Sequence, residues 1–183
     1  MPCFLNLQAP IAILIMTLDE FWAIIEASQA DNPDDQLDKY ADELYNLSEE
    51  ELLGFRTHYH QRLKESNTWE LWGAAFLINF GCSDEGFEHF RDWLIAQGRT
   101  VFTEAVSQPE SLTLIAQPEH SELEDFRFVM ADVYEENFGK TIPGLPEELE
   151  FDTDPTGTPW DEKDLGKLYP RLYAWISQFE SEA

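Results

Sequence analysis

The sequence is poor in basic residues and in cysteine. Its 183 residues hold 11 lysines and arginines against 37 aspartates and glutamates, which gives a formal net charge of −26. A surface of this sign repels phosphate groups, so nucleic acid is not an expected partner. The two cysteines, Cys3 and Cys82, are too few for a disulfide framework, and a reducing cytoplasm is the compartment that fits best.

Motifs for common chemistry are absent as well. The chain has no glycine-rich phosphate loop, no Gly-x-Ser-x-Gly elbow, no His-Glu-x-x-His pair and no dinucleotide fingerprint. Its uncharged residues 1–15 are interrupted by Pro10 and lack the basic start of a secretory signal. They are too short to span a bilayer. We therefore expect no cofactor and no membrane, and the sequence favours a non-enzymatic function.

Hydrophobic residues, by contrast, are plentiful and occur at helical spacing. With 43% hydrophobic and 14% aromatic residues, a chain of this length buries about 70% of its unfolded surface in one domain. The spacing predicts an all-α, single-domain bundle of about seven helices over residues 16–183. Residues 1–15 are expected to be an unstructured or mis-annotated extension, with Met16 as the true start. Residues 140–160, rich in proline and acids, predict a long surface loop.

A tryptophan-rich segment is the expected centre of this bundle. Trp69, Trp72, Ala75, Phe76 and Phe80 share one helical face, and the rest of that helix is also apolar, as in a buried central helix. The next helix is expected from Ser83 to Gly98, with its acids and His89 on a solvated face opposite its apolar stripe. Most tryptophans are expected in the core, although six of them leave room for an aromatic cleft.

The sequence also predicts where several helices begin. Thr17 is a suitable N-cap, and Ser48 with Glu51 forms a capping box. The same pattern at Ser121 and Glu124 predicts a helix that ends at Gly139.

Two stretches carry a family resemblance. They are Trp-Glu-Leu-Trp-Gly-Ala-Ala-Phe, from Trp69, and Gly-Cys-Ser-Asp-Glu-Gly-Phe-Glu-His-Phe-Arg-Asp-Trp-Leu-Ile-Ala-Gln-Gly-Arg, from Gly81. Both resemble the hallmark of an uncharacterised bacterial family, domain of unknown function 4240. The likeness covers roughly residues 16–106 and the Gly-Thr-Pro-Trp-Asp-Glu stretch from Gly157. The resemblance supports a helical fold and implies no catalytic residues.

Three residue groups were candidates for a metal site. His58 and His60 lie two positions apart on a helix, so they point to different faces and are expected to be solvated. Glu85, His89 and Asp92 share one face and are weak candidates for a divalent ion, with an exposed helix face as the favoured interpretation.

The third group begins at Asp152. Asp-Thr-Asp-Pro-Thr-Gly matches the start of an EF-hand loop, but Lys163 stands where its bidentate glutamate belongs. A turn before an N-cap at Asp161 is therefore the favoured interpretation, and the sequence predicts no bound metal.

The function expected from these observations is a cytoplasmic acidic protein that binds a basic protein partner, in the manner of an immunity protein or antitoxin. The alternative is an enzyme, or a small-molecule or metal binder, that uses an aromatic cleft with carboxylates and His89 or Asp161. The expected contacts with a basic partner come from the acidic loop: Glu147, Glu148, Glu150, Asp152 and Asp154.

Overall fold

The computed structural model describes residues 16–117, 121–145 and 154–179, and these residues form an all-α domain without a β-strand. The expectations for residues 1–15 lie outside the described residues. Helix boundaries in the described chain are α1 Leu18–Ala27, α2 Pro33–Tyr45, α3 Glu49–Glu65, α4 Trp69–Ile78, α5 Asp84–Ala96, α6 Arg99–Ser107, η1 Pro109–Leu114, α7 Val129–Phe138, η3 Glu162–Asp164, α8 Leu165–Leu168 and α9 Pro170–Ile176.

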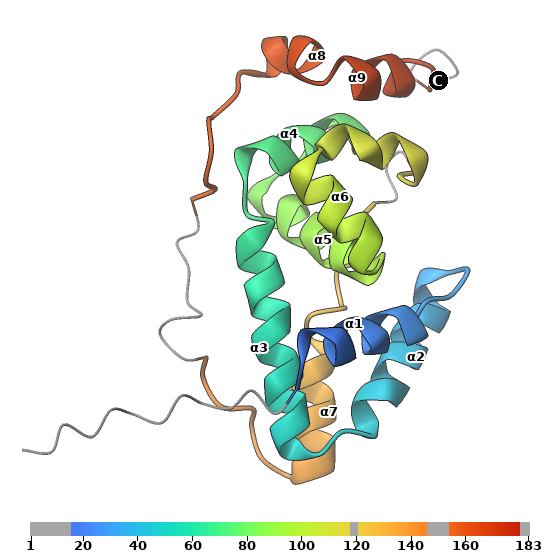
Figure 1. Cartoon of the computed structure of the whole chain (residues 1–183), viewed down its shortest axis with the longest axis vertical. Coiled ribbons are helices and arrows are strands. Elements are labelled where there is room, and N and C mark those ends of the chain that lie inside the picture. The colour runs from blue at the N-terminus through green and yellow to red at the C-terminus, as the bar shows by residue number, and fades with distance from the viewer. Residues whose placement is uncertain (1–15, 118–120, 146–153, 180–183) are drawn as a thin grey trace, which may run out of the picture.

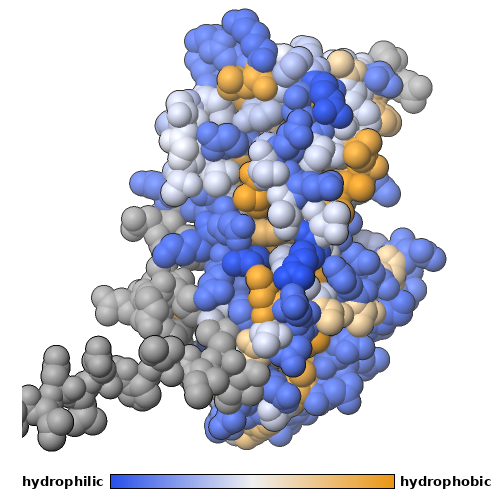
Figure 2. Space-filling model, viewed as in Figure 1, coloured by the Kyte–Doolittle hydropathy of each residue, from blue (hydrophilic) through white to orange (hydrophobic). Residues whose placement is uncertain are grey.

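The helices gather at the two ends of α3, the longest of them (Figure 1). Helices α1, α2 and α7 pack around its first half, and α4, α5 and α6 lie at its other end. The short α9 covers α4 and η1. Hydrophilic residues dominate the face in Figure 2 and leave narrower hydrophobic areas between them. Within the described chain, no helix combines the length and apolar character needed to cross a bilayer.

Local capping explains why several helices begin where they do. Thr17 is an N-cap and Ser48 forms a capping box with Glu51, as the sequence predicts. Thr17 also completes a capping box with Glu20, beyond the predicted N-cap. Ser83 accepts a hydrogen bond from the backbone N–H of Gly86 at 3.1 Å, which also confirms it as an N-cap.

Helix α4 is buried on a different side from the one that its aromatic residues suggest. Its small and aliphatic residues are buried, whereas Trp69, Trp72 and Phe76 are half-buried. Gly73 permits this packing, because a Cβ there would lie 2.8 Å from Cε2 of Tyr169 and clash. The aromatic side of α4 is therefore available to line a cavity.

The helix expected from Ser121 to Gly139 is partly wrong, because α7 begins only at Val129. The Ser121 hydroxyl donates to the carbonyl of Gln117 at 3.0 Å instead of capping a helix. The backbone N–H of Leu123 donates to the carbonyl of His89 at 3.1 Å, which ties this segment to α5. Burial of Phe126 and the tertiary contacts of Arg127 thus outweigh the local capping signal.

A short segment that we call the strap, residues 154–160, crosses the start of α4. Thr156 forms an isolated parallel bridge with Thr68, and its carbonyl accepts the N–H of Trp69 at 2.9 Å. The indole N–H of Trp160 donates to the carbonyl of Trp69 at 2.8 Å. These bonds fix the strap beside the aromatic side of α4.

Candidate binding cleft

A cavity of about 870 Å³, which we call the cleft, opens where α3, α4 and α5 meet the strap. It combines an aromatic wall with charged groups of both signs, the composition expected of a ligand site. Its lining residues are His60, Leu63, Asn67, Trp69, Trp72, Asp84, Phe87, Glu88, Arg91, Arg127, Leu145, Asp154 and Pro155.

The aromatic wall of the cleft is a parallel stack. The rings of Trp69 and Trp72 lie 5.1 Å apart at an interplanar angle of 12°, because residues three apart on a helix are neighbours. Phe87 of α5 continues the stack, 5.2 Å from Trp72 at 3°. At its end, the guanidinium carbon of Arg91 lies 5.0 Å from the centroid of Phe87, a cation–π contact.

A buried ionic network supports the base of the cleft. The Asp92 carboxylate has no exposed surface and accepts hydrogen bonds from the Tyr59 hydroxyl and from Nε of Arg127, each at 2.6 Å. Arg127 also pairs with Glu88 and donates to its backbone carbonyl at 3.0 Å. Burial raises the pKa of Asp92, and the nearby Arg127 acts in the opposite direction. The network therefore fixes the Arg127 guanidinium against α5.

The charge balance of the cleft is negative. Three carboxylates line the cleft, those of Asp84, Glu88 and Asp154. They outnumber the two guanidinium groups of the lining, Arg91 and Arg127, by one, and Asp92 adds a buried carboxylate beneath Arg127. The cleft is thus electrostatically suited to a cation.

His60 adds a neutral imidazole to the cleft. Burial, assisted by the positive charges of Arg56 and Arg127, lowers its pKa from 6.5 to about 4. As the pH falls, the His60 imidazole is protonated in the unfolded chain near pH 6.5 and in the folded protein only near pH 4. The contribution of His60 to stability is therefore complete above about pH 6.5. It is lost progressively toward pH 4.

We expect the C–H resonances of His60 to titrate with a pKa near 4 in a proton NMR titration of the folded protein. A His60→Gln variant identifies the signal by its disappearance. His89, which lies outside the cleft, provides an internal comparison in the same spectra. A measured pKa of 6 or above for His60 would contradict the burial and charge arrangement described for this side chain.

The expected solvation of the histidine pair is wrong. His58 is 8% exposed, and its Nε2 lies 2.9 Å from the carbonyl oxygen of Met16. His60 lies half-buried in the cleft. Helix α1 covers the face of α3 that carries His58, and the face that carries His60 borders the cleft.

The solvated face expected for Glu85, His89 and Asp92 is wrong at Asp92, which is fully buried. Glu85 and His89 line a separate surface depression of about 590 Å³, whereas Asp92 belongs to the network under the cleft. Within residues 16–117, 121–145 and 154–179, no group of three or more histidine, cysteine or acidic side chains is placed to hold a metal ion.

The acidic loop is represented in the cleft by Asp154, whose backbone carbonyl accepts a hydrogen bond from the Asn67 amide at 3.4 Å. The other expected contact residues, Glu147, Glu148, Glu150 and Asp152, lie outside the described residues, as does the start of the half EF-hand pattern. Gly157 and Thr156 of that pattern belong to the strap, where Thr156 bridges Thr68.

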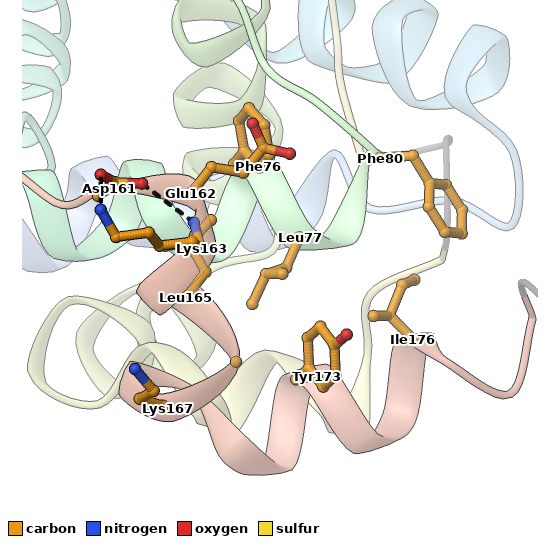
Figure 3. A pocket seen from close by; sticks show the side chains of 11 residues that line it. Phe76, Leu77, Phe80, Asp161, Glu162, Lys163, Leu165, Lys167, Tyr173 and Ile176 are labelled. Carbon is orange, nitrogen blue, oxygen red and sulfur yellow. Dashed lines mark hydrogen bonds and ion pairs between the residues drawn. The ribbon is translucent and has the colours of Figure 1, made fainter.

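Asp161 belongs to a second cavity, of about 810 Å³, between the end of α4 and the C-terminal helices (Figure 3). It caps η3, as expected from the sequence, and pairs with Lys163 at 2.5 Å. Phe80 and Tyr173 lie at the apolar side of this cavity. The ionic groups that line it, Asp161, Glu162, Lys163 and Lys167, are all exposed, so the cavity lacks the buried charge found under the cleft.

Sequence reasoning missed the two arginines and His60. The sequence does indicate that Arg91 is unusual, since it follows Phe87 by four residues and precedes Leu94 by three, which places a charge inside an apolar stripe. Nothing in the sequence indicates Arg127, because its contacts with Glu88 and Asp92 join segments 35 or more residues apart.

The family resemblance is confirmed over most of these elements. A family model described as "Protein of unknown function (DUF4240)" matches residues 16–136. The chain belongs to the DUF4240 family. The DUF4240 match contains the stacked rings, the buried network and His60, and it ends before the strap. The cleft therefore lies between the matched region and the strap, which follows it in the sequence. No curated protein and no solved structure matches the chain.

Proposed function

We propose that this DUF4240 protein is a cytoplasmic acidic binding module that holds a basic side chain of a protein partner in the cleft. The observation that carries the proposal is a half-buried aromatic wall bordered by more carboxylates than guanidinium groups. Aromatic faces attract cations, and a desolvated cation over a tryptophan gains about 2 kcal/mol. Carboxylates at the rim add charge-assisted hydrogen bonds.

The charge of the whole chain supports the same type of partner. A net charge of −26 produces a long-range field that accelerates encounter with a positively charged protein and fades as salt is added. An immunity or antitoxin-like role, in which the module occupies and blocks a basic partner, uses both the field and the cleft.

A charge reversal at the rim tests this proposal. The tagged full chain is incubated with a lysate of its native cell, washed at low salt, and eluted at high salt for mass spectrometry. We expect one stoichiometric basic protein, and we expect Asp84→Lys to reduce its capture about tenfold, because the change places a cation at the rim.

The matched control is Asp34→Lys, which makes the same change in net charge. Asp34 also lies exposed in the first turn of a helix, but in α2, outside the cleft. Equal loss of capture in both variants would show that general charge, rather than the cleft, binds the partner. An empty eluate from the unmodified protein would contradict the proposal altogether.

The second candidate function is binding or conversion of a small cationic molecule. It is favoured by the lowered pKa of His60, which lines the cleft, and the raised pKa of Asp92, which is buried beneath it, because perturbed groups cluster at chemical sites. Thermal-shift screening with small organic cations tests it. A compound that stabilises the unmodified protein and not Asp84→Lys would support this function.

A further inference from the structure

We propose that the group bound in the cleft is the guanidinium of an arginine side chain, in preference to the ammonium of a lysine. This inference rests on the proposed function and names the chemistry of the bound side chain. Three features carry it: the parallel aromatic stack, the arrangement of carboxylates around it, and the partial burial of the stacked rings.

The stack is built for planar groups. Neighbouring rings of the stack, Trp69 with Trp72 and Trp72 with Phe87, lie parallel to within 12° and about 5 Å apart. The chain itself places a guanidinium on this stack, since Arg91 lies 5.0 Å over Phe87. A planar guanidinium stacks on an aromatic face, whereas an ammonium group makes only a point contact. The Trp69 end of the stack, which is half-buried in the cleft wall, offers the equivalent surface to an incoming side chain.

Carboxylates border this surface from two elements. Asp84 comes from α5 and Asp154 comes from the strap beside Trp69, whereas Glu88 of α5 already pairs with Arg127. A guanidinium presents five N–H donors in one plane and can bond to carboxylates on different sides while its face stays on a ring. An ammonium group has only three donors and no flat face, so it makes fewer of these contacts at once.

Burial adds a further preference for arginine. Trp69 and Trp72 are half-buried and Arg91 is 6% exposed, so a side chain in the cleft loses part of its water. A guanidinium is more weakly hydrated than an ammonium and therefore enters such a site at a smaller desolvation cost. The cleft is thus selective for the shape and hydration of the cation, while the overall field of the protein attracts both types of residue.

The test compares two peptides that differ in one residue, acetyl-Gly-Gly-Arg-Gly-Gly-amide and the same peptide with lysine. Binding to the full-length ¹⁵N-labelled protein is followed by the indole N–H resonances, and a Trp69→Leu variant assigns the signal of Trp69. We expect the arginine peptide to bind about tenfold more tightly and to shift the Trp69 and Trp72 signals. Acetyl-arginine-amide is titrated in parallel to separate a peptide from a small guanidinium compound.

Trp69→Leu is expected to abolish the preference for arginine. Trp175→Leu is the matched control, because Trp175 is also half-buried but lies in α9, outside the cleft. Thermal melts establish that both variants are folded. If Trp69→Leu does not fold, Asp84→Asn replaces it, and it should weaken the arginine peptide more than the lysine peptide.

The outcomes separate this inference from the proposed function. Equal affinity for the two peptides, weakened by Asp84→Lys, would overturn arginine selectivity and leave the basic-partner proposal intact. No shift of the cleft tryptophans with either peptide would overturn the inference, while lysate capture would still decide the proposed function. If acetyl-arginine-amide binds as tightly as the arginine peptide, recognition of the arginine side chain itself is supported, whereas binding of the peptide alone would show that the backbone is bound instead and would overturn the inference.

Discussion

Replacing Asp92 with asparagine should lower the free energy of unfolding by about 3 kcal/mol. The Asp92 carboxylate is completely buried and accepts hydrogen bonds from Tyr59 and Arg127, each at 2.6 Å. Removing one partner from a buried ion pair costs about 3 to 5 kcal/mol, because the remaining charge loses its compensation. We take the lower end, since the Arg127 side chain is 21% exposed and keeps its pair with Glu88. Urea denaturation at neutral pH measures the change.

Two further variants make the Asp92 experiment specific. Tyr59→Phe removes one neutral donor and should cost about 1 kcal/mol. Glu88→Gln removes the exposed partner of Arg127, and exposed pairs contribute at most about 1 kcal/mol. If Asp92→Asn costs no more than Glu88→Gln, then the Asp92–Arg127 pair does not stabilise the domain and the described network is incorrect.

Replacing Phe126 with alanine should lower the free energy of unfolding by about 3 to 5 kcal/mol. The Phe126 ring is fully buried and stacks on Tyr40 of α2, with ring centroids 4.0 Å apart and an interplanar angle of 8°. Truncation loses both the buried apolar area and the ring contact, and it leaves a cavity that the surrounding helices fill only partly. Thermal and urea unfolding of the same variant provide the measurement.

Phe128→Ala is the matched control for Phe126→Ala. It removes the same atoms two residues away, but the Phe128 side chain is 57% exposed. We expect a change within about 0.5 kcal/mol, as for other surface substitutions. Equal effects at the two positions would contradict the conformation described for the segment before α7. The pair therefore tests the region in which the local sequence signal was misleading.

The sequence predicted helices well where local signals act alone. The N-cap at Thr17 and the capping box at Ser48 are confirmed, because a side chain and a backbone N–H three residues apart need no other element to meet. The same pattern at Ser121 fails, because its segment is held by Phe126 in the core and by Arg127 at Asp92. Local capping contributes about 1 kcal/mol, less than the burial of one phenylalanine ring.

The candidate site was only partly predictable for the same reason. An aromatic cleft was foreseen from the number of tryptophans, and Trp69 and Trp72 share a helical face through their spacing alone. The contribution of His60, Asp84 and Arg127 required knowledge of which helices meet. The exposed face expected for Glu85, His89 and Asp92 is wrong at Asp92, because α5 is buried on nearly all sides in its second half and takes Asp92 into the interior.

The sequence by itself determined the helical class, the family, the acidic charge and several helix starts. The class, the charge and the helix starts depend on composition and on local spacing along the chain, and the family depends on continuous stretches of sequence. The tertiary structure decided which face of α4 is buried, where α7 begins, and which charges surround the cleft. Those outcomes depend on contacts between distant segments, such as Asp92 with Arg127 and Trp69 with Trp160. Periodicity within a helix does not specify its neighbours, and the neighbours set burial and charge at the cleft.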